Sequence, residues 1–439
     1  MSALTNLYHL FLAWAGAVIY RHPSRRLYVV GVTGTKGKST VVELINAVLV
    51  AAGEKTALLN SVRVKVADSS EPNPTSNTMP GRFALQRFLR RAADAGCAYA
   101  IIEVTSQGVV QNRHRFIDFD AAVFLNLHPE HLESHGSFEA YRAAKVRFFA
   151  DVAARSKKQA KQFIINADDG ASGFFADAIA GRGAVRYFSR ERFVALRLGS
   201  TSLTMDRSGQ NHDEIGDWFT APFNLANAAA AEAFAGARGI NWETVRAALK
   251  GFTGVPGRME VIQERPFRVV VDYAHTPDSL SLVYETLASN RPRRPHGVGA
   301  PTEASELTPT PQLICVLGSA GGGRDVWKRP EFGRIAAAFC RDIILTDEDP
   351  YDELPEKIIK EIAEGCRNEE RGTKDEGRVH TIVDRGEAIA KAVSLAREGD
   401  VVIITGKGSE RSIHRARGAR QPWSDREAVE AALGALNSK

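Results

Sequence analysis

The chain has 439 residues, a length that suits two large domains or about three of average size. Hydrophobic residues make up 44% and charged residues 25%, values that exclude a disordered, collagen-like or multi-span membrane protein. The formal net charge of +5 is too dilute over this length to indicate a nucleic-acid surface, so we expect no nucleic-acid partner.

The cysteines are few and far apart in the sequence. Cys97, Cys315, Cys340 and Cys366 form no C-x-x-C pair. We therefore expect neither a zinc knuckle nor a disulfide framework, and a reducing cytoplasm is the default location.

The N-terminal segment at residues 7–20 (LYHLFLAWAGAVIY) is almost wholly apolar and is followed by Arg21, Arg25 and Arg26. It is shorter than the about 20 residues that a spanning helix needs, and its basic residues follow the apolar run, unlike those of a signal peptide. Two interpretations stay open. The segment is either a helix that packs on the first domain, or one that contacts an anionic membrane surface through Trp14 and the arginines.

Apolar β-branched runs then alternate with helical patterns, which is typical of an α/β fold with buried parallel sheets. The first series predicts strands at 27–32, 98–104, 121–127 and 163–167, and a helix at 40–52. A second series predicts strands at 267–273, 313–318, 342–346, 380–383 and 401–405. We expect an N-terminal helix in residues 1–25 and two domains at 26–253 and 254–439, with surface insertions at 290–311 and 368–377.

Residues 31–39 (GVTGTKGKS) lie between a predicted strand and a predicted helix and have the character of a phosphate loop. Glycines let backbone N–H groups approach phosphate oxygens, while Lys38 can reach the β/γ-phosphates and Ser39 can hold Mg²⁺. The first glycine, Gly31, is one residue earlier than in the G-x-x-x-x-G-K-[ST] template. The pattern predicts that ATP is bound by Gly34, Thr35, Lys36, Gly37, Lys38, Ser39 and Thr40.

The T-G-T-x-G-K-S variant of this loop resembles the Mur ligase family, and the chain from about Arg26 onward resembles its MurE-type members. Residues 77–81 (NTMPG) resemble the N-T-T-P-G of that family, and residues 103–113 resemble E-V-S-S-H-G-L-x-x-x-R, with Gln107 in place of His. The resemblance implies a P-loop NTPase-like central domain, which binds ATP, and a Rossmann-like C-terminal domain. It also implies that the muramoyl substrate contacts Asn77, Thr78, Thr105, Ser106 and Arg113.

The catalytic and metal residues follow from the same resemblance. Residues 126–131 (NLHPEH) resemble N-L-x-x-D-H, with Glu130 in place of Asp, and Lys145 matches a lysine that becomes carbamylated. By themselves, His131 would be an ordinary surface histidine and Lys145 a solvated lysine. The resemblance implies two Mg²⁺ ions at Ser39, Glu103, His131 and carbamylated Lys145, and catalytic roles for Lys38, Glu103, His131 and Lys145.

Three further segments resemble the family's nucleotide contacts: FNLAN at 223–227, GRME at 257–260 and DYAHTP at 272–277. They imply ATP contacts at Asn224, Asn227, Arg258, Asp272 and His275. Asp272 ends a predicted strand, and ligands of open α/β sheets collect at carboxyl ends of strands. By themselves, the two asparagines could cap the Ala-rich helix that follows.

The last segments concern the incoming amino acid. Residues 318–330, 346–351 and 406–410 resemble family motifs and imply contacts at Arg324, Asp349, Tyr351, Gly406 and Glu410. Tyr351 replaces an Arg that grips the distal carboxylate of diaminopimelate, and Ser409 replaces a His. The acidic run around Asp349 would suit a distal ammonium, so we predict lysine or ornithine over meso-diaminopimelate.

The resemblance thus implies an ATP-dependent amide ligase that adds a diamino acid to a muramoyl-peptide carboxylate through an acyl phosphate, in peptidoglycan precursor synthesis. We expect a cytoplasmic monomer. The family's N-terminal domain, which holds UDP, is not recognisable before Gly31, so UDP should contribute little to affinity. Two alternatives stay open: a folylpolyglutamate synthase-like ligase, which lacks the N-T-x-P-G and G-K-G-x-E segments, and a non-catalytic nucleotide-binding partner or regulator.

Overall fold

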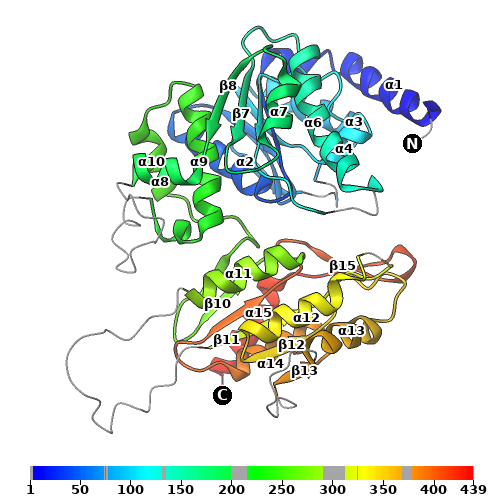
Figure 1. Ribbon diagram of the computed structural model, residues 1–439, viewed down its shortest axis with the longest axis vertical. Coiled ribbons are helices and arrows are strands. Elements are labelled where there is room, and N and C mark those ends of the chain that lie inside the picture. The colour runs from blue at the N-terminus through cyan, green and yellow to red at the C-terminus, as the bar shows by residue number, and fades with distance from the viewer. Residues whose placement is uncertain are drawn as a thin grey trace. The chain divides into compact units, whose positions relative to one another are not determined.

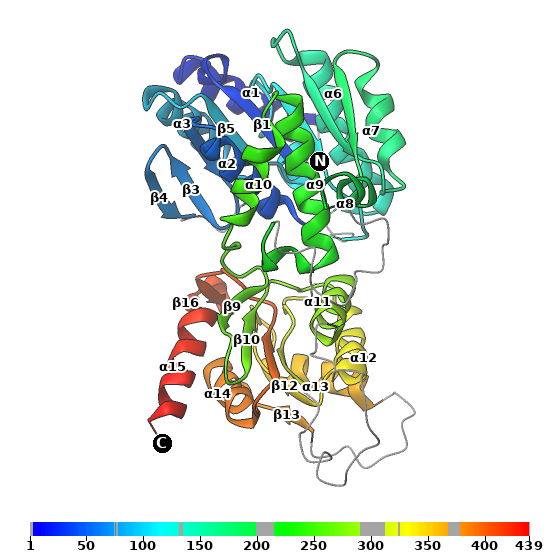
Figure 2. The same ribbon diagram turned by 90° about the vertical axis from the view of Figure 1, so that its left-hand side faces the viewer.

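The computed structural model describes residues 3–73, 75, 78–130, 135–198, 215–289, 312–323, 325–367 and 378–438. Three predicted site residues, Asn77, His131 and Arg324, lie outside these ranges, as do the two expected insertions at 290–311 and 368–377. The chain divides into two compact units, Met1–Thr253 and Gly254–Lys439. Figures 1 and 2 show the ribbon of the chain in two views.

The first unit is built on a sheet with the strand order β4-β3-β2-β5-β1-β6-β7-β8. The six strands from β2 to β8 in this order are parallel, and β3 and β4 add an antiparallel extension. The bounds are β1 (Tyr28–Thr33), β2 (Thr56–Leu59), β3 (Arg63–Val66), β4 (Ser69–Pro72), β5 (Tyr99–Glu103), β6 (Ala121–Phe124), β7 (Gln162–Asn166) and β8 (Ala184–Phe188).

Helices cover both faces of this sheet because its central strands alternate apolar side chains between two buried layers. On one face, Val29 and Phe124 pack with residues of α3 (Arg82–Asp94), α6 (Phe138–Arg155) and α7 (Ser172–Ile179). On the other, Val30 and Val123 pack with residues of α2 (Lys38–Ala51), α9 (Pro222–Ala237) and α10 (Trp242–Lys250). The remaining helices are α1 (Ala3–Ile19), η1 (Pro23–Arg26), α4 (Ser106–Val110), α8 (Arg190–Arg197) and η2 (Asp217–Thr220).

The second unit is a smaller three-layer α/β structure. Its main sheet has the order β13-β12-β11-β14-β10-β9, with only the β10–β9 pair antiparallel. Helices α11 (Pro277–Ser289), α12 (Lys328–Phe339) and α13 (Pro355–Arg367) cover one face, and α14 (Arg385–Leu395) and α15 (Asp425–Asn437) cover the other. The strands are β9 (Glu260–Gln263), β10 (Arg268–Val271), β11 (Leu313–Leu317), β12 (Asp342–Leu345), β13 (Val379–Thr381) and β14 (Val401–Ile404), and β15 (Ser412–His414) pairs with β16 (Arg420–Pro422) beside η4 (Ala416–Gly418).

These two sheets confirm the predicted fold class: a P-loop NTPase-like parallel sheet followed by a Rossmann-like α/β sheet. The sequence did not predict the parallel strands β2 and β8 or the pair β15 and β16. It also missed the antiparallel strands β3, β4 and β9, which are short and only partly buried or exposed, so that they lack a strong apolar pattern.

The expectation about cysteines is wrong in one respect. Cys315 on β11 and Cys340 at the end of α12 form a disulfide, with their Cα atoms 6.0 Å apart. Both residues are buried, and 25 positions separate them in sequence. Only the packing of α12 on β11 brings them together, so spacing along the chain gave no signal.

Within the described ranges, no helix combines the length and apolar character needed to cross a bilayer.

Candidate active site

The phosphate loop lies where the central strands of the first unit end. Strands β5, β1 and β6 are neighbours and run parallel, so the loop after β1, Glu103 at the end of β5 and Asn126 after β6 share one edge of the sheet. The loop leads directly into α2, whose first residue is Lys38. A helix N-terminus there offers unpaired N–H groups and positive potential to phosphate oxygens.

Lys38, Ser39 and Glu103 form a buried polar cluster at this edge. The Ser39 hydroxyl donates to Glu103 Oε2 at 2.8 Å, and Lys38 Nζ lies 3.9 Å from Glu103 Oε1. Ser61, which the sequence analysis did not single out, completes the cluster: its N–H donates to the same carboxylate at 3.1 Å and its hydroxyl lies 2.9 Å from that of Ser39. The cluster brings an ammonium, a hydroxyl and a carboxylate together beside the helix N-terminus.

Lys145 reaches the same loop from α6. Its side chain is buried, with 1% exposure, and Nζ donates to the carbonyl oxygen of Gly34 at 2.6 Å. Burial and the nearby Lys38 ammonium lower the pKa of Lys145 well below its ordinary value, against the opposing influence of Glu130 and Glu103. Burial therefore favours the neutral amine over the ammonium form of Lys145.

Two asparagines shape the phosphate loop. The Asn126 side-chain oxygen accepts from the backbone N–H groups of Thr35 at 3.1 Å and Lys36 at 2.8 Å. Gly37 has φ +80°, and a Cβ there would lie 2.4 Å from Asn227 Oδ1 of α9. Glycine suits this position for two reasons: it adopts the positive φ without strain, and it leaves room for the Asn227 side chain. Nearby, Asn224 Nδ2 donates to the Trp218 carbonyl at 2.9 Å.

The predicted acceptor residues lie around α4, directly after β5. Thr105 caps this helix by accepting from Gly108 N at 3.1 Å, and the adjacent Ser106 is buried. Arg113 hydrogen-bonds to the Met79 carbonyl and to Gln111 Oε1, and Thr78 is half-buried beside Met79. His135, which the sequence analysis missed, places Nε2 3.1 Å from the Ser106 hydroxyl.

In the second unit, the predicted nucleotide residues surround the end of β10. Asp272 is buried and accepts from the backbone N–H groups of Met259 and Ala274, both at 2.7 Å. The Arg258 guanidinium lies 4.0 Å from the centre of the Tyr273 ring, and within the described residues its buried Nη1 has no hydrogen-bond partner. His275 Nδ1 is 2.7 Å from the Tyr273 carbonyl. A buried donor atom without a partner suits contact with a ligand.

The predicted amino-acid residues of this unit centre on Lys407. Its buried Nζ donates to Asp349 Oδ1 at 2.8 Å and to Glu410 Oε2 at 2.5 Å, and Glu410 also accepts from the Tyr273 hydroxyl at 3.0 Å. Tyr351 stacks on His414 with ring centres 5.3 Å apart. Gly406 has φ +105°, and a Cβ there would lie 2.4 Å from Glu348 Oε2.

These contacts weaken one sequence argument. The acidic run was expected to suit a distal ammonium, but Asp349 already accepts from Lys407 and from the His414 N–H, and Asp347 is paired with Arg415. Those two charges are compensated within the protein. The expected preference for lysine or ornithine therefore depends on Tyr351 standing in place of Arg.

The first unit's polar cluster fits Mg²⁺. Within the described residues, no group of three or more His, Cys, Asp and Glu side chains could hold a metal ion. Mg²⁺ does not need such a cage, because it is usually held by one or two carboxylates together with substrate phosphates and water. Glu103 and Ser39 supply a carboxylate and a hydroxyl of this kind beside the phosphate loop.

A parallel sheet with a phosphate loop at the carboxyl ends of its strands defines a class of nucleotide-binding α/β proteins. The Mur ligase middle domain matches residues 32–235, and the Mur ligase glutamate ligase domain matches residues 257–305 and 295–408. The UDP-N-acetylmuramyl-tripeptide synthetase of Roseiflexus sp. (strain RS-1) is 37% identical over 441 residues, covering 97% of this chain and 82% of that protein. This chain belongs to the Mur ligase family and is an ATP-dependent amide ligase that uses Mg²⁺.

Further relatives agree with this assignment. The UDP-N-acetylmuramoyl-L-alanyl-D-glutamate--2,6-diaminopimelate ligase of Geobacillus kaustophilus (strain HTA426) is 35% identical over 398 residues, covering 89% of this chain and 76% of that protein. A solved structure of a ligase of that name has a TM-score of 0.57 at 28% identity and covers 94% of this chain and 79% of its own. E. coli FolC with ADP has a TM-score of 0.64 at 16% identity, covering 98% and 94%, and shows a shared fold only.

Proposed function

We propose that this chain adds a diamino acid to the carboxylate of a muramoyl peptide in peptidoglycan precursor synthesis. The observation that carries the proposal is the cluster of Lys38, Ser39 and Glu103 beside the Lys145 amine, in a chain that is 37% identical to a tripeptide synthetase. A folylpolyglutamate synthase-like activity is less well supported, because those neighbours share the fold at under 20% identity.

The reaction divides among the residues as follows. Arg113, Ser106 and Thr78 hold the acceptor carboxylate near the phosphate loop, while Asn77, outside the described residues, is expected to join them. Lys38 stabilises the negative charge of the γ-phosphoryl group as it passes from ATP to that carboxylate, which releases ADP. Ser39 and Glu103 would hold Mg²⁺, which would neutralise phosphate charge during this transfer. The amine of the incoming amino acid then attacks the acyl carbon, loses a proton and displaces phosphate.

Lys145 is proposed to act as a carbamate. Its neutral amine attacks CO₂, forms a C–N bond and releases one proton, so that the side chain ends in a carboxylate. The buried position and lowered pKa of Lys145 support this reaction, because only an unprotonated amine is nucleophilic. The carbamate would then join Ser39 and Glu103 in holding Mg²⁺, with His131 as a further expected ligand.

The nucleotide and amino-acid roles in the second unit are likewise proposals. Asp272, Arg258 and His275 of the second unit are proposed to contact ATP, and Asn224 and Asn227 of the first unit are proposed nucleotide contacts as well. Glu410 and Gly406 are proposed to meet the amino acid, with Asp349 and Tyr351 near its distal end and Arg324 at its α-carboxylate. The unpartnered Arg258 Nη1 and the Tyr351–His414 stack support these assignments.

The test is a phosphate-release assay with UDP-muramoyl-dipeptide, ATP and a panel of amino acids that includes lysine, ornithine and meso-diaminopimelate. We expect phosphate release to require both acceptor and amino acid. ATP hydrolysis without that requirement, or none with any pair, would favour a nucleotide-binding regulator. Comparison with muramoyl-dipeptide lacking UDP tests whether UDP adds affinity.

We also propose that α1 docks on an anionic membrane surface. Ala13 and Ala17 are buried, and Gly16 approaches α3, whereas the opposite face exposes a stripe made of Leu4, Leu7, Tyr8, Phe11, Trp14, Val18 and Ile19. Helix α1 carries no Asp, Glu, Lys or Arg. Arg25 and Arg26 are about half exposed but pair with Asp118 and Asp94, so the exposed Arg21 is the charge that complements anionic headgroups.

Co-sedimentation with phosphatidylglycerol vesicles tests the docking of α1. We expect the double variant Phe11→Ser/Trp14→Ser to lose vesicle binding, whereas Trp327→Ser in the second unit, which changes a tryptophan more exposed than Trp14, should keep it. Sedimentation velocity without lipid measures whether the wild type and the α1 variant are monomers or dimers. A dimer that the α1 variant dissociates would assign the stripe to a second copy and contradict the proposed monomer.

A further inference from the structure

A second polar pocket lies in the first unit, away from the phosphate loop. It has a volume of about 260 Å³ and is lined by residues that precede the central strands: His22 and Arg25 before β1, residues 114–119 before β6, and Ser156 and Lys157 before β7. The strands β1, β6 and β7 are parallel, and the phosphate loop follows β1. The pocket therefore lies at the amino ends of these parallel strands, whereas the candidate active site lies at their carboxyl ends.

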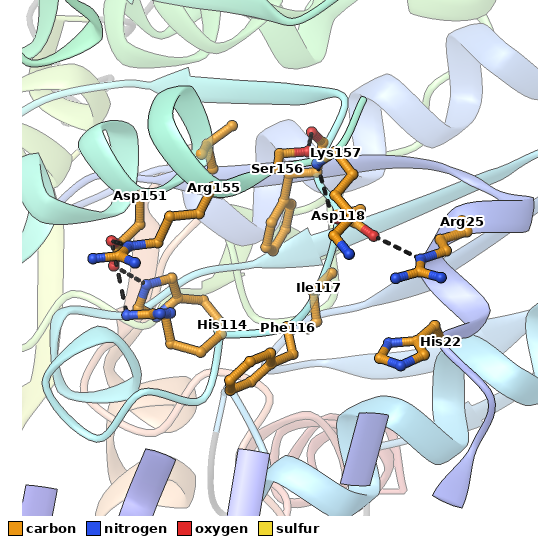
Figure 3. Close-up of a pocket in the computed structure, with 13 residues that line it drawn as sticks. His22, Arg25, His114, Phe116, Ile117, Asp118, Asp151, Arg155, Ser156 and Lys157 are labelled. Atoms are coloured by element: carbon orange, nitrogen blue, oxygen red, sulfur yellow. Dashed lines mark hydrogen bonds and ion pairs between the residues drawn. The ribbon is translucent and has the colours of Figure 1, made fainter. Parts of the chain in front are cut away.

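The pocket wall carries an excess of basic side chains. Asp118 and Asp151 are opposed by six basic residues, which are His22, Arg25, His114, Arg115, Arg155 and Lys157. Figure 3 shows Asp151 beside His114 and Arg155 in one part of the pocket, and Asp118 beside Arg25 in another.

Both carboxylates already have partners within the protein. Asp151 lies 2.8 Å from His114 Nε2 and 2.8 Å from Arg155 Nε, and Arg147 Nε approaches it at 3.5 Å. Burial opposes ionisation of Asp151, but the His114 hydrogen bond and the nearby arginines outweigh it and lower its pKa to about 2. Asp118 accepts from Arg25 Nε at 3.4 Å and from the Lys157 N–H at 3.0 Å. Arg115 Nη1 also lies 3.9 Å from Asp151 Oδ1. The pocket lining thus sets three arginines and Lys157 against two carboxylates, which leaves an excess of positive charge.

Asp151 holds His114 in the pocket wall. The His114 side chain is 2% exposed, and while Nε2 is bonded to Asp151, the buried Nδ1 has no hydrogen-bond partner in the described part of the chain. Buried polar atoms nearly always have a partner, because an unsatisfied one costs free energy. Burial lowers the pKa of His114, and Nε2–H donates to Asp151, so Nδ1 is an acceptor that could pair only with a protonated phosphate oxygen.

We propose that this pocket is a second ligand site, which binds a phosphate group. Arginine guanidinium groups match the tetrahedral oxygens of phosphate through paired N–H donors, and Lys157 adds a point charge. The volume is below the about 300 Å³ at which pockets for drug-sized ligands begin, so it suits one phosphate or a small phosphomonoester rather than a nucleotide. The group comes either from a soluble phosphate or from a lipid headgroup, since His22 closely follows α1.

The test is calorimetric titration with inorganic phosphate at constant ionic strength. It compares the wild type and Lys38→Ala with the pocket variant, Arg115→Gln/Lys157→Gln. A control variant, Arg90→Gln/Lys250→Gln, removes the same number of positive charges elsewhere in the unit. Lys38→Ala removes the contribution of the phosphate loop. We expect a site that persists in Lys38→Ala and in the control but weakens at least about tenfold in the pocket variant. Equal affinity in pocket and control variants, or loss of all binding in Lys38→Ala, would overturn the proposal.

Vesicles distinguish the two sources of phosphate. If the source is a lipid, phosphatidic acid in phosphatidylcholine vesicles should increase co-sedimentation of the wild type and of Phe11→Ser/Trp14→Ser, and the increase should be absent in the pocket variant. If only the free phosphate titration depends on the pocket residues, the ligand is soluble. The pocket variant leaves the phosphate loop intact, so its ligase activity with saturating substrates should match that of the control. The proposal is thus independent of the ligase assignment.

Discussion

The ammonium nitrogen of Lys145 lies 2.6 Å from the carbonyl oxygen of Gly34, which joins α6 to the phosphate loop. Lysine in the middle of an 18-residue helix is ordinarily solvated, but this one is buried beside the cluster that should receive ATP. The contact makes Lys145 part of the loop's architecture as well as the proposed site of carbamylation. These two roles can be separated experimentally.

Lys145→Ala should lose ligase activity, and short carboxylates such as acetate should restore part of it if a carbamate is the active form. Lys145→Arg keeps a positive charge but cannot form the carbamate, so it should be inactive and should not respond to acetate. Carbon-13 NMR with labelled bicarbonate should show a carbamate signal in the wild type only. The same signal in Lys145→Ala would contradict the assignment.

Lys38→Ala should reduce turnover by about a hundredfold or more, because it removes the positive charge that faces the transferred phosphoryl group. Steady-state phosphate release at saturating ATP measures this effect. Lys250→Ala changes an exposed lysine of the same unit and should retain full activity. If Lys38→Ala kept more than about a tenth of the wild-type rate, the role assigned to the phosphate loop would be wrong.

Gly37→Ala should impair ATP binding, since it adds a Cβ at 2.4 Å from Asn227 Oδ1 to a residue with φ +80°. Gly53→Ala is the matched control: its φ is +83°, but a Cβ there meets no atom within 4 Å. Both variants should lose about 1 kcal/mol of stability from backbone strain. Only Gly37→Ala should also raise the KM for ATP, and equal KM values in the two variants would refute the importance of the Asn227 contact.

Burial raises the pKa of Glu348 to about 7, although Arg385 and Lys407 act against the shift. In the unfolded chain a glutamate titrates near about 4.3, so between these values the folded state binds more protons and stability falls as pH rises. Glu348→Gln carries a neutral amide at every pH, so this loss of stability does not occur in the variant. The variant should therefore exceed the wild type in unfolding free energy at about pH 8, by about 4 kcal/mol at most, but not at about pH 4.

Urea unfolding at the two pH values measures the Glu348 effect. Glu356→Gln, an exposed change on the first turn of α13, should leave the difference between the two pH values as it is in the wild type. A Glu348→Gln advantage that is the same at both pH values would mean that packing, and not ionisation, is responsible.

Tyr351→Arg should shift amino-acid preference toward meso-diaminopimelate, because a guanidinium can pair with its distal carboxylate. The ratio of kcat/KM for lysine and diaminopimelate measures the shift. Tyr351→Phe keeps the ring that stacks on His414 and should retain the wild-type ratio. A wild type that uses diaminopimelate better than lysine would contradict the predicted specificity.

The sequence by itself determined the α/β class, the phosphate loop and the positions of the parallel strands other than β2 and β8. These are local: apolar β-branched runs define buried strands, and a glycine-rich turn between strand and helix defines a phosphate site. Lys38 and Ser39 could be singled out for this reason. Lys145 was assigned its role through motif resemblance alone, because nothing in its local sequence separates it from a surface residue, whereas Asp272 also ends a predicted strand.

Only the tertiary structure decided which groups meet. Ser61, Asn126 and His135 join the site from separate segments, and no spacing along the chain relates them to Ser39, Lys36 or Ser106. The Lys407–Asp349 pair compensates a charge that the sequence left open, and the basic pocket gathers residues that precede three different strands. The physical reason is common to all of them: side-chain pairing depends on sheet order and helix packing, which bring together residues far apart in sequence.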